Sequence, residues 1–126
     1  MLAEIITIGD ELLIGQTIDT NSAWIGEQLS LIGISVQQIS SITDNEQHII
    51  KALDTASDRA DIIIMTGGLG PTKDDITKHT LCKYFNTELE VNTKILERLK
   101  ERYAQFNVPL NEANQAQALI PKACTI

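Results

Sequence analysis

Short apolar runs alternate with helical patterns through the first half of the chain. Each run is rich in isoleucine and ends at glycine or at polar residues, which is typical of a buried strand. Helical patterns fill the segments between these runs, and this order favours a parallel sheet with helices on its faces. The predicted strands cover residues 3–8, 34–42 and 61–66.

The two intervening helices are predicted from their ends and from apolar residues at helical spacing. The first begins at Asp19 or Thr20 and ends at Gly33. The second begins at Asp44, which has Gln47 three residues later in the pattern of a capping box. The residues expected to face the core are Ile25, Leu29 and Ile32 in the first helix, and Ile49, Leu53 and Ala56 in the second.

The second half of the chain is predicted to be mainly helical. One helix should end near Phe85, and another should precede Pro109, with a short helix capped by Asn111 after it. Residues 119–126 resemble the approach to a further strand, so we expect the chain to be a fragment of a longer protein. The apolar stripe of the long helix consists of Ile95, Leu99, Tyr103 and Phe106.

Length and composition limit the class of protein. The chain has 126 residues, 43% of them apolar, which suits one domain over residues 1–126. Its formal net charge is −7 and it has no basic cluster, so nucleic acid is not an expected partner. No apolar stretch is long enough for a membrane span and no export signal is present, so we expect a cytoplasmic protein without a membrane partner. Cys82 and Cys124 lack metal-type spacing and are expected to be buried free thiols.

The most informative segment is the glycine loop Thr66–Thr72, which follows the third strand. Its sequence is Thr-Gly-Gly-Leu-Gly-Pro-Thr, and glycines without a Cβ let backbone amides approach a ligand. Thr72 with Asp75 three residues later predicts a helix start, where free N–H groups favour a phosphate. The alternative is a tight turn from strand to helix that binds nothing.

A second loop, from Gly9 to Gly15, leaves the first strand and carries the adjacent acids Asp10 and Glu11. Ligands of open parallel sheets bind at the carboxyl ends of the strands, where both loops begin. A carboxylate about 4 Å from a phosphate is repelled by about 4 kcal/mol at an effective dielectric constant of about 20. A divalent cation could bridge them, or the acids could accept hydrogen bonds from a heterocycle or ribose. In the third alternative the acids only complement helix dipoles, which we favour for Asp74.

Both loops together resemble the N-terminal domain of the competence/damage-inducible protein CinA family. The matching residues are Gly9-Asp10-Glu11-Leu12, the loop Thr66–Thr72 and Asp75. This family belongs to the molybdopterin-binding superfamily, and Leu69–Thr72 favours its CinA branch. The resemblance covers essentially the whole chain and implies a three-layer αβα fold with a mostly parallel sheet. The family pattern continues beyond residue 126, which implies a domain that is incomplete at its C-terminus.

The resemblance also implies an activity. The family acts as a pyrophosphatase that cleaves ADP-ribose to AMP and ribose 5-phosphate with Mg²⁺, Mn²⁺ or Co²⁺. In many members a separate C-terminal domain deamidates nicotinamide mononucleotide, and nothing in this chain corresponds to it. Members of the superfamily commonly self-associate, so a homo-oligomer is expected. The alternative function is a non-catalytic module that binds a pterin or nucleotide phosphate.

Candidate site residues follow from the two loops. Asp10, Glu11 and Asp75 are candidates for metal coordination or water activation. The phosphate would be bound by backbone N–H groups of the glycine loop and by threonine hydroxyls, while two further residues would contact substrate. The residues expected to bind the phosphate are Thr66, Gly67, Gly68, Leu69, Gly70 and Thr72. Those expected to contact the substrate are Asn21 and Lys73.

Other residues have simpler explanations. His79 follows Asp75 by one helical turn, but we favour a solvated histidine there, and His48 is expected at the surface. Trp24 is expected in the core or in an interface. The chain has no P-loop, no GxSxG nucleophile elbow and no HExxH zinc motif, so those mechanisms are excluded.

Overall fold

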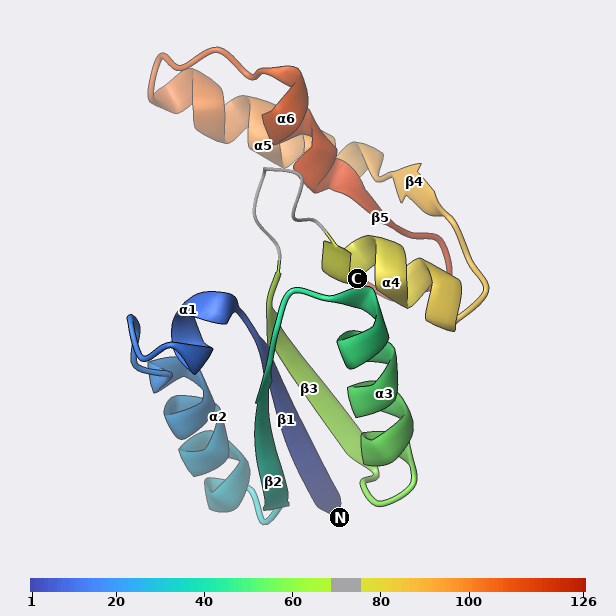
Figure 1. Cartoon of the computed structure of the whole chain (residues 1–126). Helices are drawn as coiled ribbons and strands as arrows, with labels where there is room; N and C mark the ends of the chain where they lie inside the picture. Colours follow the sequence, from blue (N-terminus) through green and yellow to red (C-terminus); the bar gives the residue numbers. More distant parts are fainter. Residues whose placement is uncertain (69–75) are drawn as a thin grey trace. The chain divides into compact units, whose positions relative to one another are not determined.

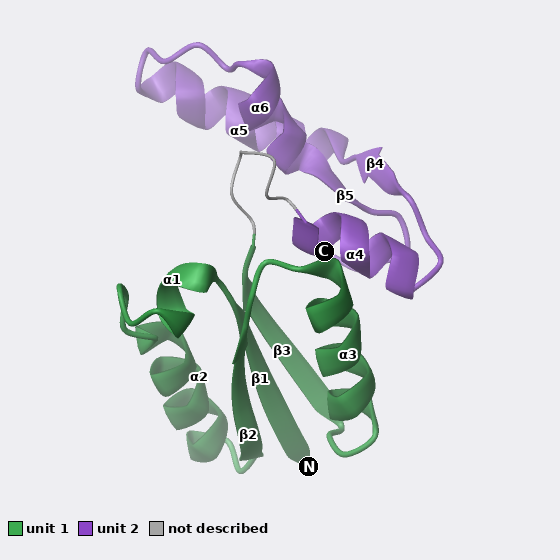
Figure 2. Ribbon diagram, in the orientation of Figure 1, with its two compact units in different colours: residues 1–68 green, residues 69–126 purple. Residues whose placement is uncertain are grey.

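The computed structural model describes residues 1–68 and 76–126. Its contacts divide the chain into two compact units, residues 1–68 and 69–126 (Figure 2). The first unit is built on a parallel sheet, and the second contains a short antiparallel pair of strands with helices. The prediction of one domain over residues 1–126 stays a prediction.

The sheet of the first unit is parallel, as the sequence predicts. Strand β1 (Leu2–Ile8) lies between β2 (Ser35–Ile42) and β3 (Ile62–Gly67), in the order β2-β1-β3 (Figure 1). The alternation of strands and helices therefore gave the correct topology for this unit. Its helices are α1 (Asp10–Leu13), α2 (Thr20–Leu31) and α3 (Glu46–Ser57).

The core of the first unit is formed by β1, which is buried on both faces, and by α3. Figure 1 shows α2 and α3 on opposite sides of the sheet, which is the expected three-layer arrangement. The predicted inward stripe of α3 is confirmed, but the stripe of α2 is only partly correct. Ile25 and Leu29 are half-buried, whereas Ile32 follows the end of α2 and is 70% exposed. The buried apolar residues here are Ala3, Ile5, Ile6, Ile8, Ile49, Leu53 and Ala56.

Side-chain caps determine where the helices begin. Asp19 caps α2, because its carboxylate accepts a hydrogen bond from the amide of Ser22 at 3.0 Å. For α3 the prediction of Asp44 was wrong: Asn45 accepts from the amides of Gln47 and His48 at 2.9 and 3.3 Å. Asn45 has the extended backbone of an N-cap, so the helix starts one residue later than expected.

An ion pair joins a buried carboxylate of the first unit to Arg59, whose side chain is 33% exposed. Glu4, on the central strand, is 1% exposed and accepts hydrogen bonds from Arg59 Nε at 2.7 Å and Nη2 at 2.8 Å. The hydroxyl of Ser40 donates a weaker bond to Glu4 at 3.4 Å. Hydrogen bonding to Glu4 raises the pKa of the Arg59 guanidinium, an effect that desolvation opposes. The pair therefore ties β1 to the turn that follows α3.

The second unit is made of short elements. The strands β4 (Leu89–Val91) and β5 (Leu119–Pro121) pair antiparallel, and β4 was not predicted. The predicted strand near the end of the chain lies at Leu119–Pro121, before residues 123–126. The helices are α4 (Ile76–Tyr84), α5 (Thr93–Gln105), α6 (Glu112–Gln115) and a 3₁₀ turn at Ala116–Ala118.

Several predictions for the second unit are confirmed and two are not. Asn111 caps α6, because its side chain accepts from the amide of Asn114 at 2.8 Å. The stripe of α5 is half-buried as far as Tyr103, but Phe106 lies at the end of the helix and is 69% exposed. Cys82 is buried, whereas Cys124 is exposed because it lies in the turn after β5.

Two surface properties complete the description. Trp24 on α2 is 63% exposed, so it does not belong to the core. Within residues 1–68 and 76–126, no helix is long and apolar enough to cross a bilayer.

Candidate functional site at the carboxyl edge of the sheet

The two loops singled out in the sequence leave neighbouring strands at the same edge of the sheet. In the register of β1 and β3, Thr7 lies opposite Thr66 and Ile8 lies opposite Gly67. The amide of Gly9 also donates to the carbonyl of Ile42 at 3.0 Å, which joins the end of β1 to the end of β2. All three strands therefore end together, and the acids after β1 start beside the glycines after β3.

Gly67 allows this close approach. A Cβ at this position would lie 1.9 Å from the carbonyl oxygen of Ile8, and the backbone φ is +93°. Gly68 also has a positive φ, of +63°. The structure thus gives Gly67 a packing role between β3 and β1 that exists without any ligand. The left-handed backbone at both positions turns the chain away from the strand direction.

The acidic loop from Gly9 to Gly15, predicted without regular structure, contains the short helix α1 and follows directly on β1. Carboxylate oxygens of Glu11 lie 2.4 and 2.8 Å from the place that a Cβ of Gly9 would take, so Gly9 leaves room for this carboxylate. The carbonyl of Glu11 accepts from the amides of Gln16 and Thr17 at 3.0 and 3.2 Å, which closes the loop. Asp10 and Glu11 are both exposed, so each is accessible to a ligand at this edge.

The remaining candidate residues are placed as follows. Thr66 is half-buried on β3, and Asn21 is exposed in the first turn of α2. His79 is exposed on α4 in the second unit. The other candidates lie outside the described residues, so their roles stay predictions. They are Leu69, Gly70, Thr72, Lys73, Asp74 and Asp75.

Sequence reasoning missed a third segment at this edge, residues 43–45 after β2. Thr43 and Asp44 are half-buried, and the Thr43 hydroxyl lies 2.6 Å from Nδ1 of His48. Since Asn45 takes the capping role, Asp44 is a further carboxylate near the ends of the strands. The parallel topology was the available signal, because it places the residues after every strand at one edge.

The described part of the site supplies carboxylates but not a complete metal centre. Within that part of the chain no three His, Cys, Asp or Glu side chains group closely enough to hold a metal ion. Asp10 and Glu11 provide the hard oxygen donors that Mg²⁺ prefers, and Mg²⁺ commonly takes one or two carboxylates together with substrate phosphate oxygens. The residues present therefore fit a divalent cation that shares its ligands with a substrate.

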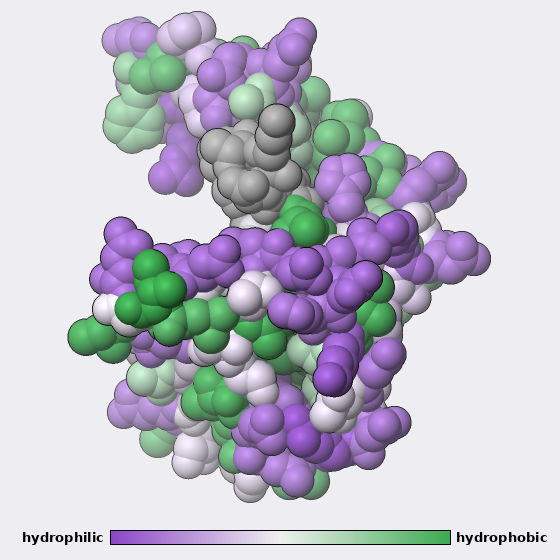
Figure 3. All heavy atoms as spheres, viewed as in Figure 1, coloured by the Kyte–Doolittle hydropathy of each residue, from purple (hydrophilic) through white to green (hydrophobic). Residues whose placement is uncertain are grey.

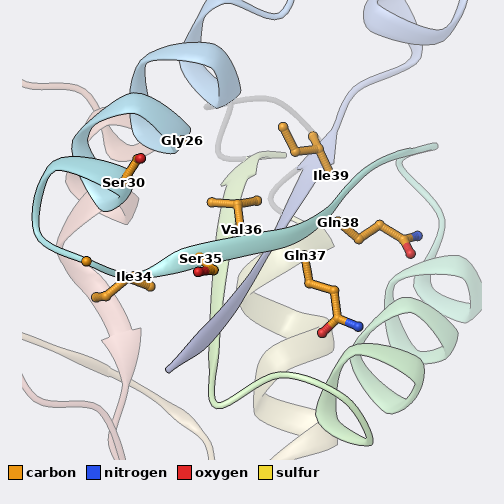
Figure 4. Close-up of a pocket in the computed structure, with 9 residues that line it drawn as sticks. Gly26, Ser30, Ile34, Ser35, Val36, Gln37, Gln38 and Ile39 are labelled. Carbon is orange, nitrogen blue, oxygen red and sulfur yellow. The ribbon is translucent and has the colours of Figure 1, made fainter.

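A different cavity lies between α2 and β2 (Figure 4). It has a volume of about 610 Å³, and in Figure 4 Val36 and Ile39 lie on one side of β2 and Gln38 on the other. None of its lining residues is charged or titratable. It is formed by the first half of β2, at the opposite end from the acids, so acid and base chemistry is not expected there.

An apolar surface flanks the acidic loop. Leu13, Ile14 and Ile18 follow the acids and are 48%, 75% and 83% exposed. Figure 3 shows apolar side chains at the surface over α1 and the loop after it. The edge of the sheet therefore combines two acids, a glycine turn and an apolar surface.

Comparisons with known proteins agree with this architecture. Residues 4–123 match the family model described as "Probable molybdopterin binding domain". A solved structure of the protein CinA from Thermoplasma acidophilum has a TM-score of 0.86 and 33% identity, over 98% of this chain and 72% of that chain. The tungsten cofactor synthesizing protein MoaB from Pyrococcus furiosus has a TM-score of 0.62 and 26% identity, over 94% and 68%.

The chain belongs to the probable molybdopterin binding domain family, and within it to the CinA proteins. A CinA-like protein of Flavobacterium psychrophilum is 51% identical over 129 residues, which cover 100% of this chain. The chain spans 30% of the length of that relative. The resemblance and the molybdopterin-binding-like fold predicted from the sequence are thus confirmed.

Proposed function

We propose that this chain contributes the nucleotide site of a metal-assisted pyrophosphatase that hydrolyses ADP-ribose to AMP and ribose 5-phosphate. The observation that carries the proposal is the pairing of Ile8 with Gly67. Because of this pairing, the acidic loop and the glycine loop begin beside each other. A ligand with two adjacent phosphate groups and a bound cation needs acids and backbone amides in such proximity. Membership of the CinA proteins supports the same assignment.

Each part of the edge has a role in this proposal. Backbone amides of the loop that begins at Gly67 and Gly68 hold one phosphate, because the absence of Cβ atoms leaves them accessible. Leu13 and Ile14 offer an apolar surface for the adenine ring. Asp10 and Glu11 face the other phosphate and orient the attacking water through their carboxylate oxygens, together with Asp75.

A divalent cation held by these carboxylates would neutralise the phosphate oxygens and lower the pKa of water. The acids alone would repel the substrate, by about 4 kcal/mol for one carboxylate about 4 Å from a phosphate at an effective dielectric constant of about 20. We therefore expect substrate binding by this site to depend on Mg²⁺, Mn²⁺ or Co²⁺.

The second candidate function is a non-catalytic module that binds a pterin or nucleotide phosphate. The family description, which names molybdopterin binding, favours it. Both functions use the amides of the glycine loop, but only hydrolysis needs a positioned water. Turnover, rather than binding, is therefore the property that separates them.

The test incubates the protein with ADP-ribose, with and without each metal, and detects AMP by chromatography. The proposal expects AMP only with metal. Glu11→Gln should reduce turnover by about 10²-fold or more while ADP-ribose still binds, since a group that acts on the water is lost. Gly68→Val should abolish binding by blocking approach to the backbone.

Binding of ADP-ribose without any AMP, in every metal, would favour the binding module. Equal binding by Gly68→Val and the unmodified protein would exclude the glycine loop as the phosphate site in both functions. Asp75→Asn is compared in the same assay, and we expect it to reduce turnover more than binding.

A further inference from the structure

The two cysteines of the chain are brought together in the second unit although they are distant in sequence. Cys82 lies in the last turn of α4, and Cys124 follows β5. Helix α4 packs against both β4 and β5.

A series of hydrogen bonds connects the two positions. The amide of Thr87 donates to the carbonyl of Cys82 at 2.9 Å, and the Thr87 hydroxyl accepts from the amide of Ala123 at 3.2 Å. Ala123 is the residue before Cys124. One threonine therefore holds the backbone beside each cysteine.

Two further contacts hold the same turn in place. The amide of Lys122 donates to the carbonyl of Glu88 at 2.9 Å, and the amide of Cys124 donates to the carbonyl of Pro121 at 3.0 Å. The turn that carries Cys124 is thus attached to the segment between α4 and β4. Its position relative to Cys82 therefore follows from these backbone contacts together with the Thr87 hydroxyl.

The environments of the two thiols differ. Cys82 is 8% exposed, whereas Cys124 is exposed. Burial raises the pKa of Cys82, and the neighbouring Cys124 raises it further. Cys124 is therefore the thiol that a reagent in solution meets first, and Cys82 is the buried partner beside it.

We propose that Cys82 and Cys124 form a reversible disulfide when the protein meets a small disulfide oxidant such as oxidised glutathione. The thiolate of Cys124 attacks one sulfur of glutathione disulfide, that S–S bond breaks, and one glutathione thiolate leaves. The thiolate of Cys82 then attacks Sγ of Cys124, the mixed disulfide breaks, and the second glutathione thiolate leaves. The two protein thiols are oxidised, glutathione disulfide is reduced, and the two protons end on the two glutathione molecules.

The new bond would join the end of α4 to the turn after β5. It would close a covalent ring that contains β4, α5 and α6, and so restrict the unfolded chain of the second unit. This modification site is separate from the proposed nucleotide site, so each proposal can fail without the other.

The test treats the folded protein with excess oxidised glutathione, blocks remaining thiols with an alkylating agent, and measures the intact mass and the cross-linked peptides. A monomer lighter by about 2 Da, the mass of the two hydrogens lost on disulfide formation, is expected. It should contain one peptide pair joined through residues 82 and 124, and a reducing agent should reverse the change.

Matched variants identify the order of the steps. Cys82→Ser should retain one glutathione on Cys124, and Cys124→Ser should remain unmodified because Cys82 is buried. Closure of the ring should accelerate about tenfold per pH unit below the pKa of Cys82, since only the thiolate attacks. The proposal would be overturned if the protein with both cysteines kept glutathione on Cys124, or if it formed only dimers linked through Cys124.

Discussion

The two units of this chain are stabilised in different ways. In the first unit, β1 contributes residues that are 0 or 1% exposed, and α3 adds three more buried apolar side chains. In the second unit, α5 has no buried residue, although it is one of the longest helices of the described chain. Burial of a large apolar side chain contributes about 1.5–3 kcal/mol, so the first unit has the stronger hydrophobic contribution.

Side-chain caps are present in both units, so they do not offset this difference. The side chain of Asn92 accepts from the amide of Ile95 at 3.0 Å at the start of α5, and Asn111 has the same role for α6. Each such cap is worth about 1 kcal/mol. The comparison teaches that burial of β1 and α3, rather than helix capping, distinguishes the first unit from the second.

The largest effect is expected at the junction of β1 and β3. Gly67→Ala should lower the free energy of unfolding of the first unit by about 3 kcal/mol or more, because the new Cβ meets the Ile8 carbonyl at 1.9 Å in a left-handed backbone. Urea denaturation followed by circular dichroism measures the change.

The matched control for this substitution is Gly26→Ala in α2. Apart from its chain neighbours and the backbone of its own helix, no atom lies within 4 Å of its added Cβ, and alanine favours a helix by up to about 1 kcal/mol. Equal stability of the two variants would contradict the prediction, because it would show that the packing of Gly67 against β1 tolerates a larger side chain.

A second pair of variants tests the contrast in burial directly. Leu53→Ala in α3, where the side chain is 3% exposed, should cost about 3 kcal/mol, because it leaves a cavity in the core. Leu96→Ala in α5, where the residue is half-buried, should cost about 1 kcal/mol. Both values come from urea denaturation, and equal costs would contradict the difference between the units.

The smallest effects on stability are expected when two ion pairs are removed one at a time. Glu4→Gln weakens the pair between the buried Glu4 carboxylate and the partly exposed Arg59, so the melting temperature should fall by several degrees at neutral pH. Glu88→Gln removes an exposed contact with Lys122 at 3.9 Å, where the side chains are 79% and 62% exposed. Its melting temperature should change by about 1 °C or less.

Thermal scans at low and high salt provide the check on these two variants. Salt should reduce the effect of Glu4→Gln less than that of Glu88→Gln, because partly buried pairs are screened less than exposed ones. An equal loss in both variants would show that the pair between Glu4 and Arg59 adds no more than a surface contact.

Local patterns predicted much of this structure. Strands β1, β2 and β3 and helices α2, α3 and α5 follow from apolar spacing, and the cap Asn111 follows from its residue type and position, whereas β4 was missed. Each wrong prediction has its own physical cause. Asp44 and Asn45 are both good caps, and only the backbone conformation shows that Asn45 is used. Phe106 fits the periodicity of α5, but the helix ends before this residue, which leaves it exposed.

By itself the sequence determined the order of the three sheet strands with α2 and α3, the family, and the two segments that form the candidate site, because periodicity, turn residues and motifs are properties of neighbouring positions. Tertiary structure alone decided which distant residues meet. It pairs Gly67 with Ile8 in the sheet and forms the ion pair between Glu4 and Arg59. It also places Cys124 beside the end of the helix that carries Cys82. Such contacts depend on strand register and packing, which arise only when the whole chain folds.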